Sequence, residues 1–407
     1  MNMTVRMLAL SLLQAVAHAQ VVSQVHLGLT TAAVDCPHGI SVAFASDKAT
    51  PWTVEFTDGD CTNAVESQVH RYELDAYTSP YLHEAVLSNM PPTTQFSYEI
   101  GSFESSFVTP PQSFNTHACV LVGDFAYANG NHTIWDQWYT LLEPYLSRVP
   151  SVGINGNHET DVASDGFVAE RYLGYVNRAN TPITQDDAAN LRTYYSIDIG
   201  LIHCVFLDDQ VGSSFKAGSP AWLAERQVMA DWFTVDLDRV DRQETPYVVV
   251  FKHNPFYNTF DDHQCQCSPT VFEILDKDAC WEGEYVYAST EEEPACGLQA
   301  KLEDIYAHFK VDVVVSGHVH GYERTDYIYQ NEVNHERGSV YVTTGSGGRS
   351  HIVKNLTGDF SWSLFKEGLA FGATRIIATP SNLRLLWFAN DDLTTPRDAA
   401  TLYPRFR

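Results

Sequence analysis

Alternating hydrophobic and polar residues dominate the first quarter of the chain and predict β-strands. The alternation is clearest in four segments: Val25–Leu29, Ile40–Phe44, Trp52–Phe56 and Phe96–Ile100. Successive side chains of a strand point to opposite faces, so a period of two indicates sheets with one buried face. Turn-rich gaps separate the segments. We therefore expect a small β-sandwich over residues 22 to 108.

After a Thr109–Gln112 linker rich in proline, the pattern changes to strands that alternate with helices. The expected strands are Cys119–Val122, Leu201–Leu207, Tyr247–Phe251, Val311–Val315, Val340–Thr344, Ala373–Thr379 and Leu383–Phe388. The expected helices are Trp135–Leu146, Leu298–Phe309 and one that begins at Pro220 with Ser219 as its N-cap. Such alternation is typical of an α/β or α/β/α domain.

The charge of the chain narrows the classes of function. Its 407 residues include 25 Lys and Arg against 51 Asp and Glu, so the formal charge is 25 − 51 = −26. A surface this acidic repels phosphate backbones and anionic lipids, which argues against binding to nucleic acids or membranes. An anionic substrate would need a local positive centre, and a bound metal ion is the obvious candidate.

The N-terminus reads as a signal peptide over residues 1–19. Arg6 precedes the apolar run Met7–Ala17, and small residues at Ala17 and Ala19 favour cleavage before Gln20. No later apolar run approaches the roughly 18 residues of a membrane span. We therefore expect a secreted, extracellular protein. Two glycosylation sequons fit this expectation, at Asn131 and Asn355.

Eight cysteines are also consistent with an oxidising compartment. Cys36 and Cys61 could pair within the first domain. Four others crowd one stretch of the chain: Cys265, Cys267, Cys280 and Cys296. We expect disulfides among these four, because Cys-x-Cys is poor spacing for the alternative, a zinc cluster. The remaining two, Cys119 and Cys204, are expected to be buried thiols.

Four apolar strands end abruptly in residues of metal-ligand type. The ends are Gly123-Asp124-Phe-Ala-Tyr127, Gly156-Asn157-His158-Glu159, Lys252-His253-Asn254 and Gly317-His318-Val-His320. Loops converge at the carboxyl ends of strands in α/β sheets, and a glycine before the ligand allows a tight turn. Each motif alone is more often a turn or a surface loop. All four together, in this order, indicate one shared site.

These motifs resemble those of the purple acid phosphatases, a group of metallophosphoesterases. The similarity includes Val250-Phe-Lys-His253 and extends through His253–Asn258, Gly321–Arg324, Gly345–Gly348 and Phe365–Gly368. The N-terminal segment resembles the fibronectin-type-III-like domain of the plant-type members. The resemblance implies a signal peptide (1–19), a β-sandwich (20–110) and a metallophosphoesterase catalytic domain (111–407) built as an α/β/α sandwich of mixed sheets.

The resemblance also implies a role for each strand-end residue. Asp124 would bridge two metals, Tyr127 and His320 would bind a ferric ion, and Asn157, His253 and His318 would bind a divalent ion. His158 would contact the phosphate or protonate the leaving group. His263 occupies the position of a substrate-contacting histidine of the family, whereas the family's neighbouring histidine is Asp262 here.

The ligand chemistry agrees with that assignment. Carboxylate and phenolate oxygens suit Fe³⁺, and imidazole with an amide oxygen suits Zn²⁺, Fe²⁺ or Mn²⁺. A dinuclear centre of this kind lowers the pKa of a bound water, so that hydroxide can attack phosphorus while the cations offset charge on the phosphoryl oxygens.

The chain departs from the family at one point, because the first motif, Gly-Asp-x-Gly, is absent. Only Gln112 to Ala118 separates the linker from the Cys119 strand, and Gly59-Asp60 lies in the sandwich. The ferric ion would lose a carboxylate ligand, and the domain would lose one βα unit. Either a segment was lost from the sequence or this is a shortened relative; the intact remaining ligands favour a lost segment.

The sequence thus predicts a secreted acid phosphatase that acts on small phosphate monoesters. Two alternatives remain open: a phosphodiesterase or pyrophosphatase with the same centre, with specificity set by a loop such as 261–297, and a catalytically impaired relative or non-enzymatic binding module. A homodimer is also left open.

Overall fold

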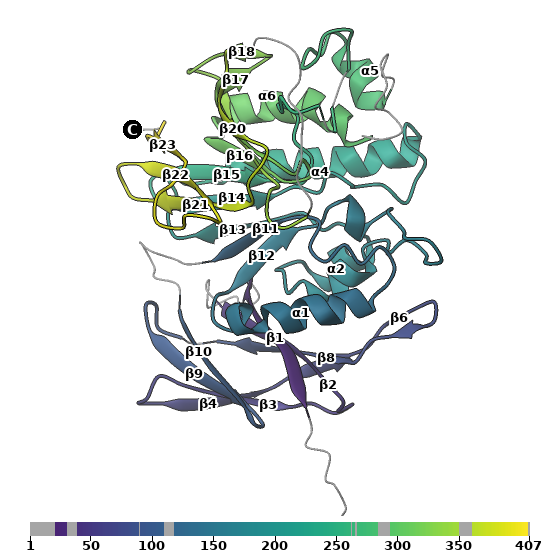
Figure 1. Cartoon of the computed structure of the whole chain (residues 1–407), viewed down its shortest axis with the longest axis vertical. Coiled ribbons are helices and arrows are strands. Elements are labelled where there is room, and N and C mark those ends of the chain that lie inside the picture. Colours follow the sequence, from purple (N-terminus) through teal and green to yellow (C-terminus); the bar gives the residue numbers. More distant parts are fainter. Residues whose placement is uncertain are drawn as a thin grey trace, which may run out of the picture.

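The structure of the protein is a computed structural model. It describes residues 21–30, 39–88, 90–109, 118–261, 263–264, 267–283, 294–349 and 360–405. Several sequence-based expectations lie outside these residues: the signal peptide, most of the linker, Cys36, Cys265, Asp262 and the sequon at Asn355. The described chain forms two stacked regions of sheet with helices between and beside them (Figure 1).

The first region is the β-sandwich expected from the alternating pattern. Its strands are β1 (Val22–Thr30), β2 (Gly39–Ser46), β3 (Thr53–Thr57), β4 (Thr62–Glu66), β5 (Gln68–His70), β8 (Tyr81–Leu87), β9 (Gln95–Ile100) and β10 (Phe103–Val108). A short hairpin, β6 (Glu73–Leu74) and β7 (Tyr77–Thr78), stands beside them. One sheet has the order β10-β9-β3-β4, and the other contains β1-β2-β8-β5. All four segments predicted from the alternation are strands.

The second of these sheets does not end at β1. It continues into β12 (Ser151–Ile154) and β11 (Cys119–Val122), giving the order β11-β12-β1-β2-β8-β5. β1 and β12 run parallel, with Gly28 opposite Ser151. A side chain at residue 28 would meet the Asn180 carbonyl oxygen at 2.3 Å, so the close approach requires glycine. The sandwich and the motif-bearing strands are therefore joined by backbone pairing.

The second region centres on an eight-stranded mixed sheet. Its order is β13-β14-β15-β16-β19-β17-β18, and β20 pairs with β17. The strands are β13 (Tyr195–Ile199), β14 (Ile202–Phe206), β15 (Tyr247–Phe251), β16 (Val313–Ser316), β17 (Tyr322–Tyr329), β18 (Glu332–Val333), β19 (Ser339–Thr344) and β20 (Ser363–Glu367). A separate sheet, β21 (Gly372–Ala378), β22 (Leu383–Ala389) and β23 (Asp398–Leu402), follows near the C-terminus. The mixed α/β fold predicted from the sequence is confirmed.

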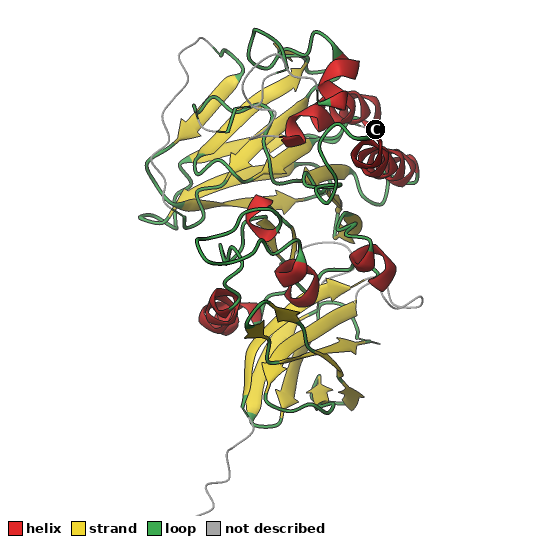
Figure 2. Cartoon of the chain, turned by 90° about the vertical axis from the view of Figure 1, so that its right-hand side faces the viewer, coloured by secondary structure: helices red, strands yellow, loops and turns green. Residues whose placement is uncertain are grey.

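Helices lie to one side of the eight-stranded sheet (Figure 2). The described residues form the helices α1 (Thr133–Leu146), α2 (Leu173–Arg178), α3 (Gln185–Ala189), α4 (Pro220–Asp238), α5 (Lys277–Glu282) and α6 (Gln299–Phe309), with short 3₁₀ turns η1 (Asn157–Glu159) and η2 (Pro294–Leu298). The Ser219 hydroxyl accepts a hydrogen bond from the Trp222 N–H and caps α4 as expected.

Strand β15 consists of five apolar residues, all of which are buried. Val248 and Val250 pack into the cluster formed with α4 and α6, whereas Tyr247, Val249 and Phe251 pack into the core on the opposite face. A strand buried on both faces carries apolar side chains at every position. The continuous apolar pattern in the sequence therefore marks the centre of the sheet.

The cysteines follow the expectation only in part. Cys61, for which a pairing with Cys36 was expected to be possible, is a free and exposed thiol. Cys267 and Cys280 form a disulfide across the start of α5. Cys204 is a buried thiol, whereas Cys119 is only half-buried. The disulfide lies in the crowded stretch, as predicted.

The buried side chain of Arg178 connects the first sheet to helix α1. The Arg178 guanidinium, 1% exposed, donates to the hydroxyls of Tyr72 and Tyr77, to the Gln24 side chain at 3.1 Å and to the Asp136 carboxylate at 2.9 Å. Gln24 belongs to β1 and Asp136 to α1. Because these partners come from the first region and from α1, the arginine contributes to the placement of α1 on the first sheet.

We expect Arg178→Ala to destabilise the protein by about 3 kcal/mol, since the half-buried Asp136 carboxylate, the Gln24 side chain and two tyrosine hydroxyls lose their partner. Thermal and urea unfolding would measure the change. Arg192→Ala is a matched control, because Arg192 pairs with Glu225 at the surface and should cost at most about 1 kcal/mol. Equal effects for both variants would contradict the role given to Arg178.

A second ionic cluster joins β14 to α4. His203 lies between Asp198, at 2.7 Å, and Asp236, at 2.9 Å. Burial alone would lower the pKa of His203, but hydrogen bonds to the two carboxylates outweigh it and raise the pKa to about 9. The imidazole is therefore a cation in the folded protein at neutral pH.

The raised pKa of His203 predicts a stability that depends on pH. The contribution is complete below the unfolded pKa of about 6.5 and is lost as the pH rises through 9. Relative to His203→Gln, the wild type should be more stable by roughly 2 kcal/mol at pH 6, since one pKa unit is worth about 1.4 kcal/mol and the exposed Asp198 is screened. Urea unfolding should show the difference disappearing by pH 10; a difference that does not change with pH would disprove the assignment.

Candidate metal centre

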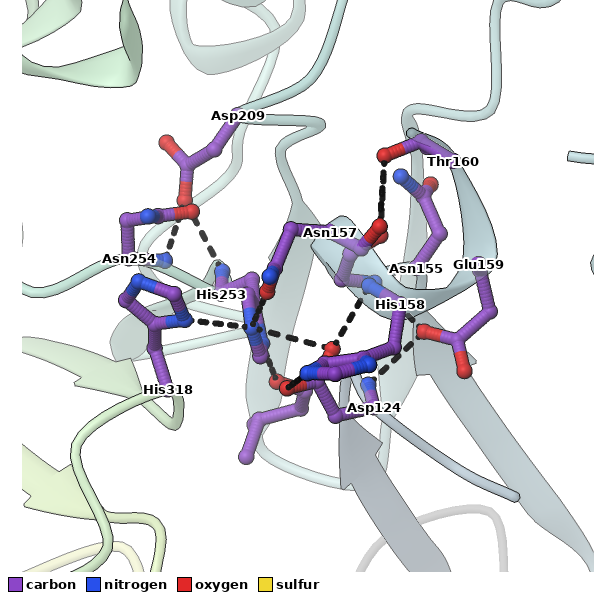
Figure 3. Close-up of polar contacts among 12 residues, drawn as sticks. Asp124, Asn155, Asn157, His158, Glu159, Thr160, Asp209, His253, Asn254 and His318 are labelled. Carbon is purple, nitrogen blue, oxygen red and sulfur yellow. Dashed lines mark hydrogen bonds and ion pairs between the residues drawn. The ribbon is translucent and has the colours of Figure 1, made fainter. Parts of the chain in front are cut away.

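The four motif-bearing strand ends meet at one place, as the sequence predicts. β11 and β12 are parallel neighbours in one sheet, and β15 and β16 are parallel neighbours in the other. Asp124 follows β11, Asn157 follows β12, and His253 and His318 follow β15 and β16. The facing carboxyl ends of the two strand pairs bring these four side chains together (Figure 3).

His253 is the centre of the group. Its Nε2 lies 3.3 Å from Asp124 Oδ1, 3.0 Å from Asn157 Oδ1 and 3.1 Å from His318 Nδ1. Donor atoms of Asp124, His253 and His318 all lie within 4.8 Å of one another. His253 is fully buried and the Asp124 side chain is 7% exposed. One carboxylate, two imidazoles and an amide oxygen therefore surround a common point.

A second group adjoins the first. The Tyr127 hydroxyl lies 3.0 Å from His320 Nε2. The His158 ring lies 4.3 Å from the Tyr127 ring, and its Nε2 is 4.0 Å from Asp124 Oδ2. Tyr127 and His320 thus form a phenol and imidazole pair near the Asp124 carboxylate. The carboxylate is positioned between the two groups.

The His263 ring lies against this centre, with its centroid 3.8 Å from that of His318. All eight site residues predicted from the sequence are therefore gathered in one place. Their proximity is a geometric fact; the role of each remains a proposal.

The backbone at the site is strained in a way that indicates function. Asp124, Tyr127, His263 and His318 all have left-handed backbone conformations, with φ of 55°, 52°, 52° and 64°. Such angles are unfavourable for residues other than glycine, and they cluster at functional sites where the surrounding structure imposes them. These four are among fifteen described non-glycine residues with such angles, and three of the four, Asp124, Tyr127 and His318, carry proposed donor atoms.

The motif glycines are needed for two different reasons. Gly123 has a φ of 88°, which fits the expected tight turn. Gly156 does not adopt a left-handed angle; instead, a side chain there would meet Asp124 Oδ1 at 2.2 Å. Gly317 likewise would meet the Val122 carbonyl oxygen at 2.8 Å. Close approach of the strand ends, rather than a turn, therefore requires glycine at these two positions.

Sequence reasoning assigned no role to Glu159, although it stands in the motif. Its carboxylate accepts hydrogen bonds of 2.8 Å from the backbone N–H groups of Asp124, Phe125 and Gly156. The side chain is buried and ties the loop after β11 to the loop after β12. Glu159 therefore holds the backbone that presents Asp124.

Asp209 performs the same task for His253. It accepts the backbone N–H groups of His253 and Asn254, at 2.9 and 2.7 Å, and pairs with Lys252 at 2.8 Å. Asp209 follows strand β14, so it carries the same signal as the ligands: an apolar strand that ends in a polar residue. That signal was present in the sequence and could have identified it.

The charges at the centre favour a bound cation. Burial alone would raise the pKa of Asp124, but the charge of His253 and its hydrogen bond hold it well below its usual range. Burial would lower the pKa of His253, and Asp124 instead raises it to about 9. In the absence of a metal ion, the Asp124 carboxylate thus keeps the neighbouring His253 imidazole protonated. A cation bound at this point would displace that proton.

Two further pKa shifts fit the same site. Burial, followed by the charge of Asp124, raises the pKa of Tyr127 above its usual range. Burial lowers the pKa of His158 to about 4, so its imidazole is neutral at mildly acidic pH. The donor set as a whole combines hard oxygen ligands with imidazoles, which suits transition metals. The residues present therefore fit the predicted metals.

Comparison with known proteins agrees with this geometry. A model of the calcineurin-like phosphoesterase family matches residues 111–322. The chain belongs to the calcineurin-like phosphoesterase family. It is 26% identical over 372 residues to a purple acid phosphatase of Ipomoea batatas, covering 79% of this chain and 70% of that one. It is 25% identical over 379 residues to the Fe(3+)-Zn(2+) purple acid phosphatase 12 of Arabidopsis thaliana, covering 80% and 72%.

The fold of this phosphoesterase is also that of a solved relative. A purple acid phosphatase isolated from yellow lupin (Lupinus luteus) seeds superposes with a TM-score of 0.72 at 20% identity, over 94% of this chain and 74% of that one. The predicted membership among plant-type purple acid phosphatases is confirmed, and with it a metal-dependent phosphatase activity. Family and donor cluster together support a dinuclear metal centre.

We expect Glu159→Gln to weaken Zn²⁺ binding by roughly 10- to 100-fold, because an amide cannot accept all three N–H groups that position Asp124. Competition with a chromophoric chelator would measure the affinity. Glu303→Gln is the matched control: Glu303 is also buried and accepts the Tyr257 hydroxyl and the Gln330 N–H, but it belongs to α6. Unchanged Zn²⁺ affinity in Glu159→Gln would refute the positioning role.

Proposed function

We propose that this phosphoesterase is a secreted acid phosphatase that hydrolyses phosphate monoesters. The observation that carries the proposal is the meeting of six donor side chains from four strand ends around the Asp124 carboxylate. When bound, the two ions supply Lewis-acid activation of water and neutralise charge on the phosphoryl oxygens. The residues of the chain then have three tasks: holding the ions, placing the ester and moving a proton.

The first task belongs to the two donor groups. Asp124 would bridge the ions, because its two oxygens face different groups, Oδ1 toward His253 and Oδ2 toward His158. Asn157, His253 and His318 would hold a divalent ion, and Tyr127 with His320 would hold a ferric ion. The ferric position has three protein ligands against four at the divalent position, so we expect it to bind its ion more weakly.

Proton transfer falls to His158. Its Nδ1 lies 2.7 Å from Asn129 Oδ1, which fixes the ring and leaves Nε2 toward the centre. The neutral imidazole would gain a proton when a phosphate dianion binds beside it, because a neighbouring negative charge raises the pKa. It could then return the proton to the leaving oxygen. His263, whose ring is tilted against that of His318, would contact the ester.

Two features support secretion and the domain assignment. The Cys267–Cys280 disulfide is of the kind that persists in oxidising compartments, and the signal-like segment at 1–19 agrees. No described helix is both long and apolar enough to cross a bilayer. The paired sheets of the first ten strands support a fibronectin-type-III-like domain over residues 20–110, followed by the catalytic domain at 111–407.

Turnover of an aryl phosphate monoester by the metal-loaded protein tests the proposal. We expect Asp124→Ala to lower kcat by about 10³-fold or more, because the bridging carboxylate serves both ions. The metal content should fall in the same sample. Asp392→Ala, at an exposed turn, is the control and should match the wild type.

A parallel assay with an aryl phosphate diester separates the substrate classes. A higher kcat/KM for the monoester supports the proposal, and a higher value for the diester would replace it with a phosphodiesterase. A folded, metal-loaded wild type that releases no phosphate from either ester would refute it.

A further inference from the structure

One exposed arginine lies at the metal centre and has no role in the assignments above. The guanidinium of Arg349 stands 4.8 Å from the centre of the Tyr127 ring. Tyr127 in turn contacts His320 and the ring of His158. Arg349 is exposed to solvent. The site therefore has a cation at its edge, on the side of the tyrosine.

The topology of the sheet explains why Arg349 is found there. Strand β19 runs parallel to β16, with Thr343 opposite Ser316, so the loops after both strands leave the same edge of the sheet. The β19 loop packs against the β16 loop: the Gly345 N–H bonds to the Gly321 carbonyl at 3.1 Å. A side chain at Gly345 would meet the Val319 carbonyl oxygen at 2.0 Å. The loop that carries Arg349 is thus fixed beside His318 and His320.

The start of this loop is anchored before it reaches the arginine. Ser346 is fully buried, and its carbonyl accepts the Gly372 N–H at 3.0 Å. Gly347 and Gly348 are exposed and have no neighbouring atoms within 4 Å of an added side chain. From this anchored base the Arg349 guanidinium reaches the Tyr127 ring, where a cation–π contact holds it near the donor cluster.

The acidic charge of the chain indicates why a cation is needed at the site. The chain carries a formal charge of −26, which repels an anionic ester at long range. The neighbouring cation Lys252 is 5% exposed and committed to Asp209, so it cannot meet the ester. A guanidinium pairs with two phosphoryl oxygens at once, and such charge-assisted hydrogen bonds are among the strongest in proteins.

We propose that Arg349 is a substrate-binding residue whose guanidinium, held against Tyr127, binds the non-bridging oxygens of a phosphate monoester. The inference rests on the proposed function and adds a source of selectivity to it. A monoester presents a dianion, whereas a diester presents a single negative charge. Arg349 therefore favours monoesters over diesters.

Binding of orthophosphate to the metal-loaded protein, measured by calorimetry, tests the proposal without turnover. We expect Arg349→Ala to weaken binding by roughly 10- to 100-fold, since hydrogen bonds between charged groups are involved. Arg349→Lys should recover part of the affinity, because it keeps the charge but loses the fork. Arg384→Ala, an exposed arginine on β22, is the control and should bind orthophosphate as the wild type does.

Kinetics provide the second readout. In Arg349→Ala the KM for an aryl monoester should rise about tenfold with kcat within about threefold, and the ratio of monoester to diester kcat/KM should fall. Unchanged orthophosphate affinity would overturn the proposal, and so would a loss of metal from Arg349→Ala, which would make the residue a support for Tyr127. A wild type that binds orthophosphate through Arg349 but hydrolyses no ester would refute the proposed function alone. A wild type that binds no orthophosphate would overturn both.

Discussion

The contact between the Asp124 carboxylate and the buried His253 imidazole is the interaction on which the site depends. It joins the loop after β11 to the loop after β15, and therefore one sheet to the other. Two acidic residues hold the backbone on either side: Glu159 binds the N–H groups around Asp124, and Asp209 binds those at His253 and Asn254. Without a cation, a proton balances the charge of the carboxylate. The geometry is thus prepared in advance for a positively charged occupant.

Much of the fold could be predicted because the central strands are recognisable from their own short stretches of sequence. β11 and β15 have the bounds expected from the sequence, since each is an apolar run bounded by polar residues; β15 is buried at every position and β11 is half-buried. The pairing of β1 with β12 could not be predicted. It joins residues more than a hundred positions apart, and it requires glycine at position 28, where a side chain would meet the Asn180 carbonyl oxygen.

In the site, too, local motifs could be predicted and long-range contacts could not. Side chains that bear the chemistry stand in compact motifs and were found from their order along the chain. The residues that position them were not found. Glu159 acts through backbone N–H groups, which carry no sequence signal of their own, whereas Asp209 did carry one, because it follows an apolar strand. Arg349 became visible only when parallel strands placed its loop beside that of His318.

The two donor groups beside Asp124 are unequal. Asn157, His253 and His318 cluster closely with Asp124, whereas the other group consists of Tyr127 and His320 alone. Anomalous diffraction from crystals soaked with Zn²⁺ or Fe³⁺ would test the account most directly. It predicts a strong metal peak in contact with Asp124, Asn157, His253 and His318, and a weaker one toward Tyr127 and His320. Metal bound elsewhere, with these side chains empty in a folded protein, would contradict it.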